Sequence, residues 1–151
     1  MANEERRWLS EDEQRTWRAF LGATRHLFEE LDRELQRDAG MPHSYYVILV
    51  ALSEAPGRTL RMTELARLAG ASPSRLSHAV SRLEEQGWVQ RSACATDRRG
   101  AWAHLTDAGL EVLQACAPGH VASVRCHLFD RLTPAQVGQL RAISEAVLGD
   151  K

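Results

Sequence analysis

The sequence has little that would point to a membrane, an oxidising compartment or a disordered chain. It contains no run of 18 apolar residues, so no membrane-spanning helix is predicted. The N-terminal residues lack the apolar stretch of a secretory signal. Only three cysteines occur, Cys94, Cys116 and Cys126, and no two of them form a CxxC pair. This usage favours a reducing compartment, and we expect a cytoplasmic protein.

Motifs for catalysis and nucleotide binding are also missing. No GxGxxG, P-loop, GxSxG or HExxH occurs, and the six histidines are scattered. The spacing of Cys116 and His120, with Cys126 and His127 nearby, leaves a metal site open as an alternative. Pro118 disturbs the helical geometry that such a site needs, so small buried side chains and surface histidines are the preferred interpretation. We expect no enzymatic activity, no cofactor and no metal.

The composition is that of an ordinary globular chain whose charge is unevenly distributed. Its 151 residues are 44% hydrophobic and 26% charged, which suits one domain or two small interlocked ones. The net charge is −1, yet residues 61–106 carry seven arginines against four acids, a net of +3 that leaves −4 elsewhere. A basic segment of this kind is typical of a DNA-binding surface, although a chance imbalance would look the same.

The N-terminal third predicts two helices. Ser10 and Glu13 form a capping box at the start of a long amphipathic helix, which ends before Gly40 and Pro42. Its apolar residues follow helical spacing: Trp17, Phe20, Leu21, Thr24, Leu27, Phe28, Leu31 and Leu35. A second, mostly buried helix is predicted over Ser44–Glu54, before Pro56 and Gly57.

The middle of the chain predicts two short helices followed by a hairpin. Thr63 is expected to cap the first helix, and Gly70 to end it. Ser72 caps the next helix, with Pro73 at its first position. The expected core stripe of this second helix is Leu76, Ala79, Val80 and Leu83. Two strands, Trp88–Ser92 and Ala101–Thr106, then flank a polar loop. This order predicts a winged helix-turn-helix, in a fold that is mostly α with a small β wing.

The C-terminal third predicts two more helices. One begins at Thr106 or Asp107, and Pro118-Gly119 predicts a kink or a break within it. A second capping box, Thr133 to Gln136, opens the last helix. The residues of that helix expected to face inward are Val137, Leu140, Ile143 and Val147. Because these helices and the first one carry more apolar surface than a small winged domain can cover, we expect a C₂ homodimer.

The second helix of the helix-turn-helix carries short polar and basic side chains where surface helices usually carry Glu and Lys. A recognition helix enters the major groove of DNA with its N-terminus first. We expect Arg75 to bind guanine and His78 to meet a base edge. The predicted phosphate contacts are Ser72, Ser74, Ser77 and Arg82. At the tip of the wing, Arg98 and Arg99 are expected to flank the duplex, with one of them entering a narrow minor groove. The alternative is a polar face that is merely solvated.

The order of elements resembles the MarR family of bacterial transcriptional regulators. The resemblance rests on TELARLAGASPSRLSHAVSRLEEQGWVQR and on DRRGAWAHLTDAG, in which the family's wing signature corresponds to Asp97, Arg99, Leu105, Thr106 and Gly109. It implies a winged helix-turn-helix domain over residues 43–106 and dimerisation helices over residues 10–40 and 107–148. It also implies that Arg99 enters the minor groove and that Arg98 contacts phosphate. Because Asp97 lies two residues before Arg99 in a tight turn, we expect it to brace a neighbouring arginine or the loop backbone. Cys94-Ala95-Thr96 departs from the family's usual wing and predicts fewer phosphate contacts.

The function predicted from these features is that of a regulator, specifically a repressor that binds palindromic double-stranded DNA as a homodimer. The alternative is a winged helix used for protein–protein contact. Relatives bind small aromatic acids, and the residues expected to line such an effector pocket are Trp17, Phe20, His43, Tyr45 and Tyr46, which could instead be core residues. Cys94, near the wing arginines, is a candidate oxidant sensor or an inert thiol.

Overall fold

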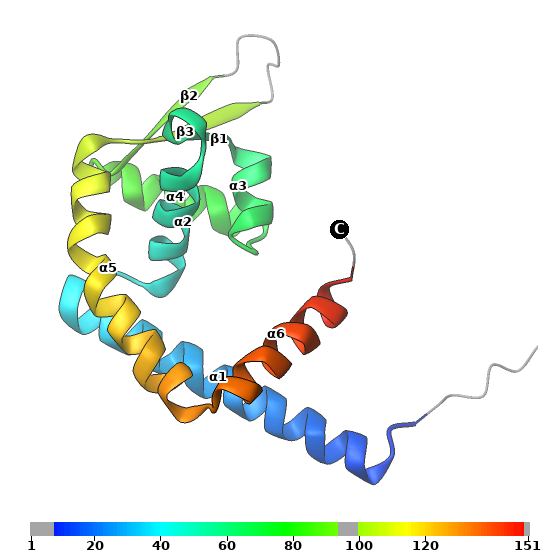
Figure 1. Cartoon of the computed structure of the whole chain (residues 1–151). Coiled ribbons are helices and arrows are strands. Elements are labelled where there is room, and N and C mark those ends of the chain that lie inside the picture. The colour runs from blue at the N-terminus through cyan, green and yellow to red at the C-terminus, as the bar shows by residue number, and fades with distance from the viewer. Residues whose placement is uncertain (1–7, 94–99, 150–151) are drawn as a thin grey trace, which may run out of the picture.

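A computed structural model describes residues 8–93 and 100–149 of the chain (Figure 1). Figure 1 shows a lobe formed by the shorter helices and the sheet, with the long helices α1 and α5 leading away from it and α6 projecting at the far end. In chain order the elements are α1 (Glu11–Ala39), α2 (His43–Glu54), η1 (Pro56–Arg58), β1 (Thr59–Arg61), α3 (Met62–Leu68), α4 (Pro73–Glu85), β2 (Val89–Ala93), β3 (Ala101–Leu105), α5 (Asp107–His127), η2 (Phe129–Arg131) and α6 (Pro134–Leu148). The predicted fold class, mostly α with a small β wing, is confirmed.

The ends of α1 lie where the sequence predicts them. The Ser10 hydroxyl accepts a hydrogen bond from the Glu13 amide at 3.1 Å, and the Ser10 amide donates to the Glu13 carboxylate at 2.7 Å. Gly40 ends the helix in the left-handed region, with φ of +60°, a conformation that a side chain makes unfavourable. The second predicted capping box, Thr133 with Gln136, is likewise present at the start of α6.

One element was not predicted, and the start of two helices differs from the prediction. The unpredicted element is β1, a strand of three residues that pairs with β3 and gives the sheet the order β1-β3-β2. Helix α3 starts at Met62, and no side chain caps it, so Thr63 is not its N-cap. Helix α2 starts at His43, one residue early, because the Asp32 carboxylate of α1 accepts a hydrogen bond from the His43 amide at 2.8 Å.

Helix α5 runs through Pro118 without the break that the sequence allowed. A proline removes one backbone donor, here the N–H that would bond the Gln114 carbonyl, and it crowds the preceding turn. Packing of α5 along α1 keeps the two halves in one helix. Figure 1 shows the axis of α5 bending along its length, which agrees with a kink rather than a break.

The core lies in the winged lobe, where α2, α3, α4 and the sheet meet. The predicted stripe of α4 is confirmed, since Leu76, Val80 and Leu83 are almost fully buried. They pack with Leu49 and Leu65 from the two preceding helices in one continuous cluster. No helix in the described ranges is long and apolar enough to cross a bilayer.

Helix α6 has no buried residue in the single chain, so the inward orientation predicted for its apolar side chains is wrong at this level. Ile143 is 59% exposed and Val147 is 79% exposed. The reason is geometric, because α6 projects from the rest of the chain and finds no surface of its own to pack on (Figure 1). Trp17 and Phe20 on α1 are about half exposed as well.

Candidate DNA-binding surface

Helices α3 and α4 form the helix-turn-helix. Gly70 takes the left-handed conformation in the turn, with φ of +61°, and the Ala71 amide donates to the Ala66 carbonyl at 3.0 Å. Ala66 is 7% exposed and Leu76 is 1% exposed, so the small residue and the leucine both lie in the core between the helices. The turn and the packing together fix the orientation of α4 relative to α3.

The N-terminal half of α4 presents most of the predicted DNA contacts to solvent. Ser72 is the N-cap, and its hydroxyl accepts a hydrogen bond from the Arg75 amide at 3.3 Å. Ser72, Ser74, Arg75 and His78 are all exposed. The Arg75 guanidinium pairs with no other side chain in the described part of the molecule. It is therefore available to a ligand, as base readout requires.

Ser77 is more buried than its exposed polar neighbours on α4, because an arginine from the wing lies over it. In the sequence, this arginine contributed only to the count of basic residues. Arg91 on β2 donates to the Ser81 hydroxyl at 3.0 Å and, at 3.5 Å, to the hydroxyl of Ser77. Its Nε also donates to the Glu84 carboxylate at 2.7 Å. Arg91 thus connects the wing to the recognition helix. No local sequence pattern predicts such a contact between a strand and a helix.

Arg82 lies further along α4 and is already paired. Its guanidinium donates to the Glu85 carboxylate at 2.8 Å, with both side chains more than half exposed. Exposed pairs of this kind contribute little to stability and exchange readily for another anion. Arg82 therefore remains suited to the phosphate contact predicted for it.

The base of the wing is held by a histidine that joins all three strands. The two ring nitrogens of His104 on β3 lie 2.8 Å from the Thr59 hydroxyl of β1 and 2.7 Å from the Ser92 hydroxyl of β2. Beside it, the Arg61 guanidinium lies 5.1 Å from the centre of the Trp102 ring, a cation–π contact. The four wing-loop residues named from the sequence, Cys94, Asp97, Arg98 and Arg99, lie outside the described residues.

The junction between the wing and α5 explains the Leu105-Thr106-x-x-Gly109 signature physically. The Thr106 hydroxyl donates to the Gly87 carbonyl at 2.7 Å and accepts from the Gly109 amide at 3.0 Å. The Thr106 amide donates to the Trp88 carbonyl at 3.0 Å. A Cβ atom on Gly109 would overlap that same carbonyl oxygen. This corner therefore requires a glycine and a hydroxyl three residues apart.

Two of the predicted effector residues meet around His120. The His120 ring centre lies 4.3 Å from that of Tyr46 and 5.5 Å from that of His43. Burial lowers the pKa of His43, and burial together with the nearby His43 lowers the pKa of His120. Both imidazoles are therefore neutral at pH 7. Tyr46 is itself 7% exposed and belongs to the core.

The five predicted effector residues do not line one cavity in the single chain. Trp17 and Phe20 stack on each other, with ring centres 6.3 Å apart. Along α1, Trp17 lies about 16 Å and Phe20 about 12 Å from Phe28, the residue that contacts His43. A cavity of about 350 Å³ does lie between α1 and α5, and none of the five lines it. Its walls, which the sequence did not reveal, are Leu31, Glu34, Leu35, Asp38, Ala39, Trp88, Val112, Ala115, Cys116, Gly119, His120 and Ser123.

A helix-turn-helix with an exposed N-terminal surface, followed by a β wing, defines a winged helix-turn-helix protein. A model of the MarR family matches residues 39–100. Sco3205, a MarR family transcriptional regulator from Streptomyces coelicolor solved in complex with DNA, is 56% identical; the match covers 97% of this chain and 91% of that one, with a TM-score of 0.91. The chain belongs to the MarR family.

Two further relatives show the range of similarity. AbsC, another MarR family transcriptional regulator from Streptomyces coelicolor, is 42% identical, and the match covers 94% of this chain and 95% of AbsC with a TM-score of 0.86. The transcriptional repressor MprA of Escherichia coli is 25% identical over 109 residues, which are 72% of this chain and 61% of MprA. The chain thus spans less than two thirds of the length of that curated relative.

Proposed function

We propose that this chain is a cytoplasmic transcriptional repressor without enzymatic activity, which binds palindromic operator DNA as a homodimer. The observation that carries the proposal is the N-terminal half of α4, where Arg75 and His78 are exposed and the Arg75 guanidinium has no partner among the described residues. Support comes from Sco3205, which is 56% identical and has been solved in complex with DNA. MprA, a more distant relative, is a transcriptional repressor.

The contacts divide into base readout and phosphate positioning. Arg75 reaches guanine with its two-pronged guanidinium, and His78, one turn further along, meets a neighbouring base edge. Ser72 and Ser74 flank the N-terminus of α4, where free amides and the helix dipole favour a phosphate. The remaining phosphate contacts are assigned to Ser77, whose hydroxyl shares Arg91, and to Arg82.

The wing supplies the contacts outside the major groove. In this proposal Arg99 enters the minor groove and Arg98 binds phosphate, while Asp97 braces the loop. These three residues lie outside the described structure, and their roles rest on the family resemblance. The described base of the wing supports them indirectly, because His104 and Arg91 hold β2 and β3 firmly against the lobe.

The dimer follows from the apolar surface that the single chain leaves uncovered. The exposed large hydrophobic side chains of α1, α5 and α6 include Trp17, Phe20, Phe28, Val121, Ile143 and Val147. Exposed apolar side chains on three long helices are what an interface between two copies would cover. A two-fold dimer buries the same surface on both copies and sets two recognition helices at the spacing of a palindrome.

We expect sedimentation at micromolar concentration to give twice the chain mass. Ile143→Glu places a charge on the exposed apolar face of α6 and should shift the protein toward the monomer. Leu68→Glu is the matched control, because Leu68 is a comparably exposed apolar residue on α3, in the winged lobe; it should leave the dimer intact. A folded wild-type monomer would contradict the proposal.

The DNA-binding proposal is tested by selecting bound fragments from a random duplex library and then titrating a selected site. We expect an inverted repeat, with affinity on the order of 10⁻⁸ M or tighter at physiological salt. Affinity should fall steeply as salt increases, because each neutralised phosphate releases counterions. Equal affinity for selected and random duplexes of the same length would favour the alternative, a winged helix that serves protein–protein contact.

The cavity between α1 and α5 is the place we assign to a small aromatic effector. Its walls are mainly apolar, and the buried His120 Nδ1 has no partner among the described residues. Mostly apolar cavities with a few polar groups are typical of small-molecule sites. The rings of Tyr46 and His43 do not line this cavity but pack against the His120 ring, so they act on the site through His120.

A further inference from the structure

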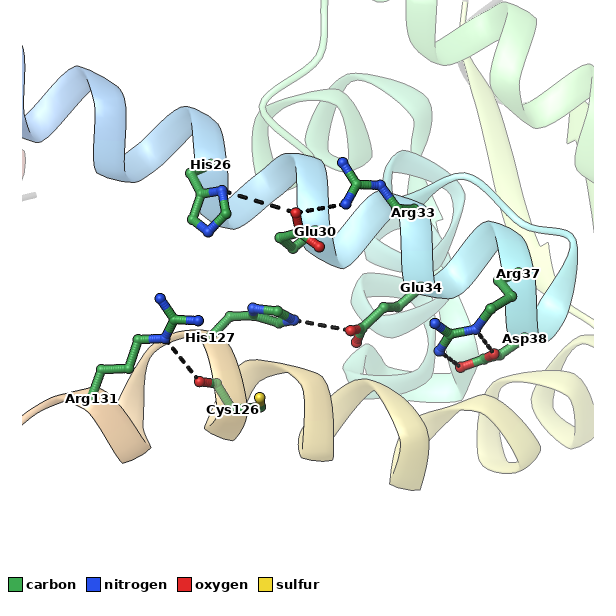
Figure 2. A network of polar contacts seen from close by, with 9 residues as sticks. All are labelled: His26, Glu30, Arg33, Glu34, Arg37, Asp38, Cys126, His127 and Arg131. Carbon is green, nitrogen blue, oxygen red and sulfur yellow. Dashed lines mark hydrogen bonds and ion pairs between the residues drawn. The ribbon is translucent and has the colours of Figure 1, made fainter.

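A cluster of carboxylates and imidazoles lies where α1 crosses the end of α5, away from the DNA-binding surface. His26, Glu30 and Glu34 recur every four residues along one face of α1, and His127 is the last residue of α5. Figure 2 shows these side chains converging between the two helices. The His127 Nε2 lies 2.9 Å from a Glu34 oxygen, and the His26 Nδ1 lies 3.9 Å from a Glu30 oxygen.

The side chains of this cluster are largely shielded from solvent, and not all of their polar atoms have hydrogen-bond partners. The side chains of His127, Glu30 and Glu34 are 12%, 17% and 26% exposed. The hydrogen bond between Glu34 and His127 is the main reason that the pKa of Glu34 is lowered, so the Glu34 carboxylate is charged at neutral pH. One neighbouring buried atom, His127 Nδ1, has no hydrogen-bond partner in the described part of the chain. Unsatisfied buried polar groups are rare, and a bound ion or water is one common explanation.

We propose that Glu30, Glu34 and His127 bind a divalent transition-metal ion, with Zn²⁺ as the preferred occupant. One ligand atom of each residue lies within 4.8 Å of those of the other two. At zinc–ligand bonds of about 2.1 Å, tetrahedral ligand atoms lie about 3.4 Å apart. The Glu34–His127 pair, at 2.9 Å, needs to open only slightly to admit the ion.

The chemistry of the donors supports a transition metal over calcium or magnesium. Imidazole nitrogen with carboxylate oxygen is a donor set that zinc accepts, whereas magnesium and calcium prefer oxygen alone. The two carboxylates balance the charge of the ion. Arg33, which now donates to Glu30 at 2.7 Å, is 66% exposed and can turn into solvent. His26, 55% exposed, is close enough to supply a fourth ligand after a side-chain rotation.

Such an ion would connect the middle of α1 to the junction between α5 and α6. Figure 2 shows the Arg131 side chain of η2 directed back at the last turn of α5, where it donates to the Cys126 carbonyl at 3.2 Å. The metal would therefore stabilise the region from which the dimerisation helix α6 departs. Ligand binding to the native state alone raises the unfolding temperature, by roughly 5–10 °C at a concentration one hundred times the Kd.

The test is calorimetric titration of the chelator-treated, full-length protein with ZnCl₂. We expect one ion per chain and a higher unfolding temperature. Glu34→Gln and His127→Gln should each weaken binding by at least roughly tenfold. Glu30→Gln leaves the Glu34–His127 contact between α1 and α5 in place and should weaken zinc binding as well, so the result does not depend on a variant that loses this contact. Glu29→Gln is the control, because Glu29 is an exposed neighbour on α1 outside the cluster.

X-ray absorption of the zinc-loaded protein separates this site from one built on the cysteines. A first shell of nitrogen and oxygen alone supports the proposal. A sulfur ligand would overturn it, since Cys116 or Cys126 would then hold the ion. The proposal is also overturned if the wild type does not bind zinc stoichiometrically, or if Glu29→Gln and the three cluster variants bind it with equal affinity. The cluster would then serve only to join α1 and α5 by hydrogen bonds. None of these outcomes bears on the DNA-binding proposal.

Discussion

Gly109→Ala will destabilise the protein by about 3 kcal/mol or more, the upper part of the range for overpacked sites. Gly109 lies in the first turn of α5, and an added Cβ would overlap the Trp88 carbonyl oxygen and come within 2.8 Å of a Leu105 methyl group. The carbonyl cannot move away without losing its hydrogen bond from the Thr106 amide. The start of α5 must therefore shift away from the wing.

Helix propensity alone predicts that Gly109→Ala stabilises the protein, so the experiment distinguishes the two effects. Replacing glycine with alanine inside a helix normally stabilises by about 1 kcal/mol. Gly119→Ala is the matched control in the same helix, because a Cβ there would meet no atom within 4 Å. Urea unfolding at one fixed protein concentration should show the control equal to or more stable than the wild type and Gly109→Ala much less stable. A stabilised Gly109→Ala would contradict the close approach described for this corner.

Arg75→Ala will cost more in base discrimination than in general affinity for DNA. A two-pronged contact between arginine and guanine is worth about 1–3 kcal/mol against the wrong base, or roughly a 5- to 150-fold change in the ratio of affinities. Arg75 can make that contact because it is exposed near the N-terminus of α4, where Ser72 caps the helix. Gel-shift titrations on a selected operator and on a copy with one guanine replaced measure the ratio directly.

Arg82→Ala provides the comparison on the same helix. Arg82 is paired with Glu85 and lies two turns further along α4, so its loss should weaken both duplexes by a similar factor and reduce the salt dependence by about one unit. If Arg75→Ala also weakens both duplexes equally, Arg75 is a phosphate contact and the assignment to guanine is wrong.

Much of the fold could be predicted because local signals and tertiary structure agree. Ser10, Ser72 and Thr133 cap the helices that the sequence assigned to them, since N-capping depends on residues within one turn. The core stripe of α4 was equally readable, because helical spacing determines which side chains share a face. The strand β1 was missed because three residues carry too short a pattern to be recognised.

The candidate site was only partly predictable. The sequence was sufficient to propose Arg75 and His78 as DNA contacts, because that proposal depends only on their residue types and their positions in α4. It did not reveal that Arg91 reaches from β2 to Ser81 and Glu84 of α4. It also did not reveal that Trp17 lies far along α1 from Phe28, the residue that contacts His43. These spatial relations involve residues that are far apart in the sequence, so the spacing of residues within one helix or strand does not predict them.

The sequence by itself determined the winged helix-turn-helix, the Ser72 cap of its second helix and the polar, basic face of that helix. These features depend on backbone conformation and on side-chain spacing within a single element. Only the tertiary structure decided which side chains from different elements meet, such as Glu34 with His127 or Gly109 with the Trp88 carbonyl. The physical reason is that such contacts depend on how elements cross, and the crossing is set by the packing of the whole core.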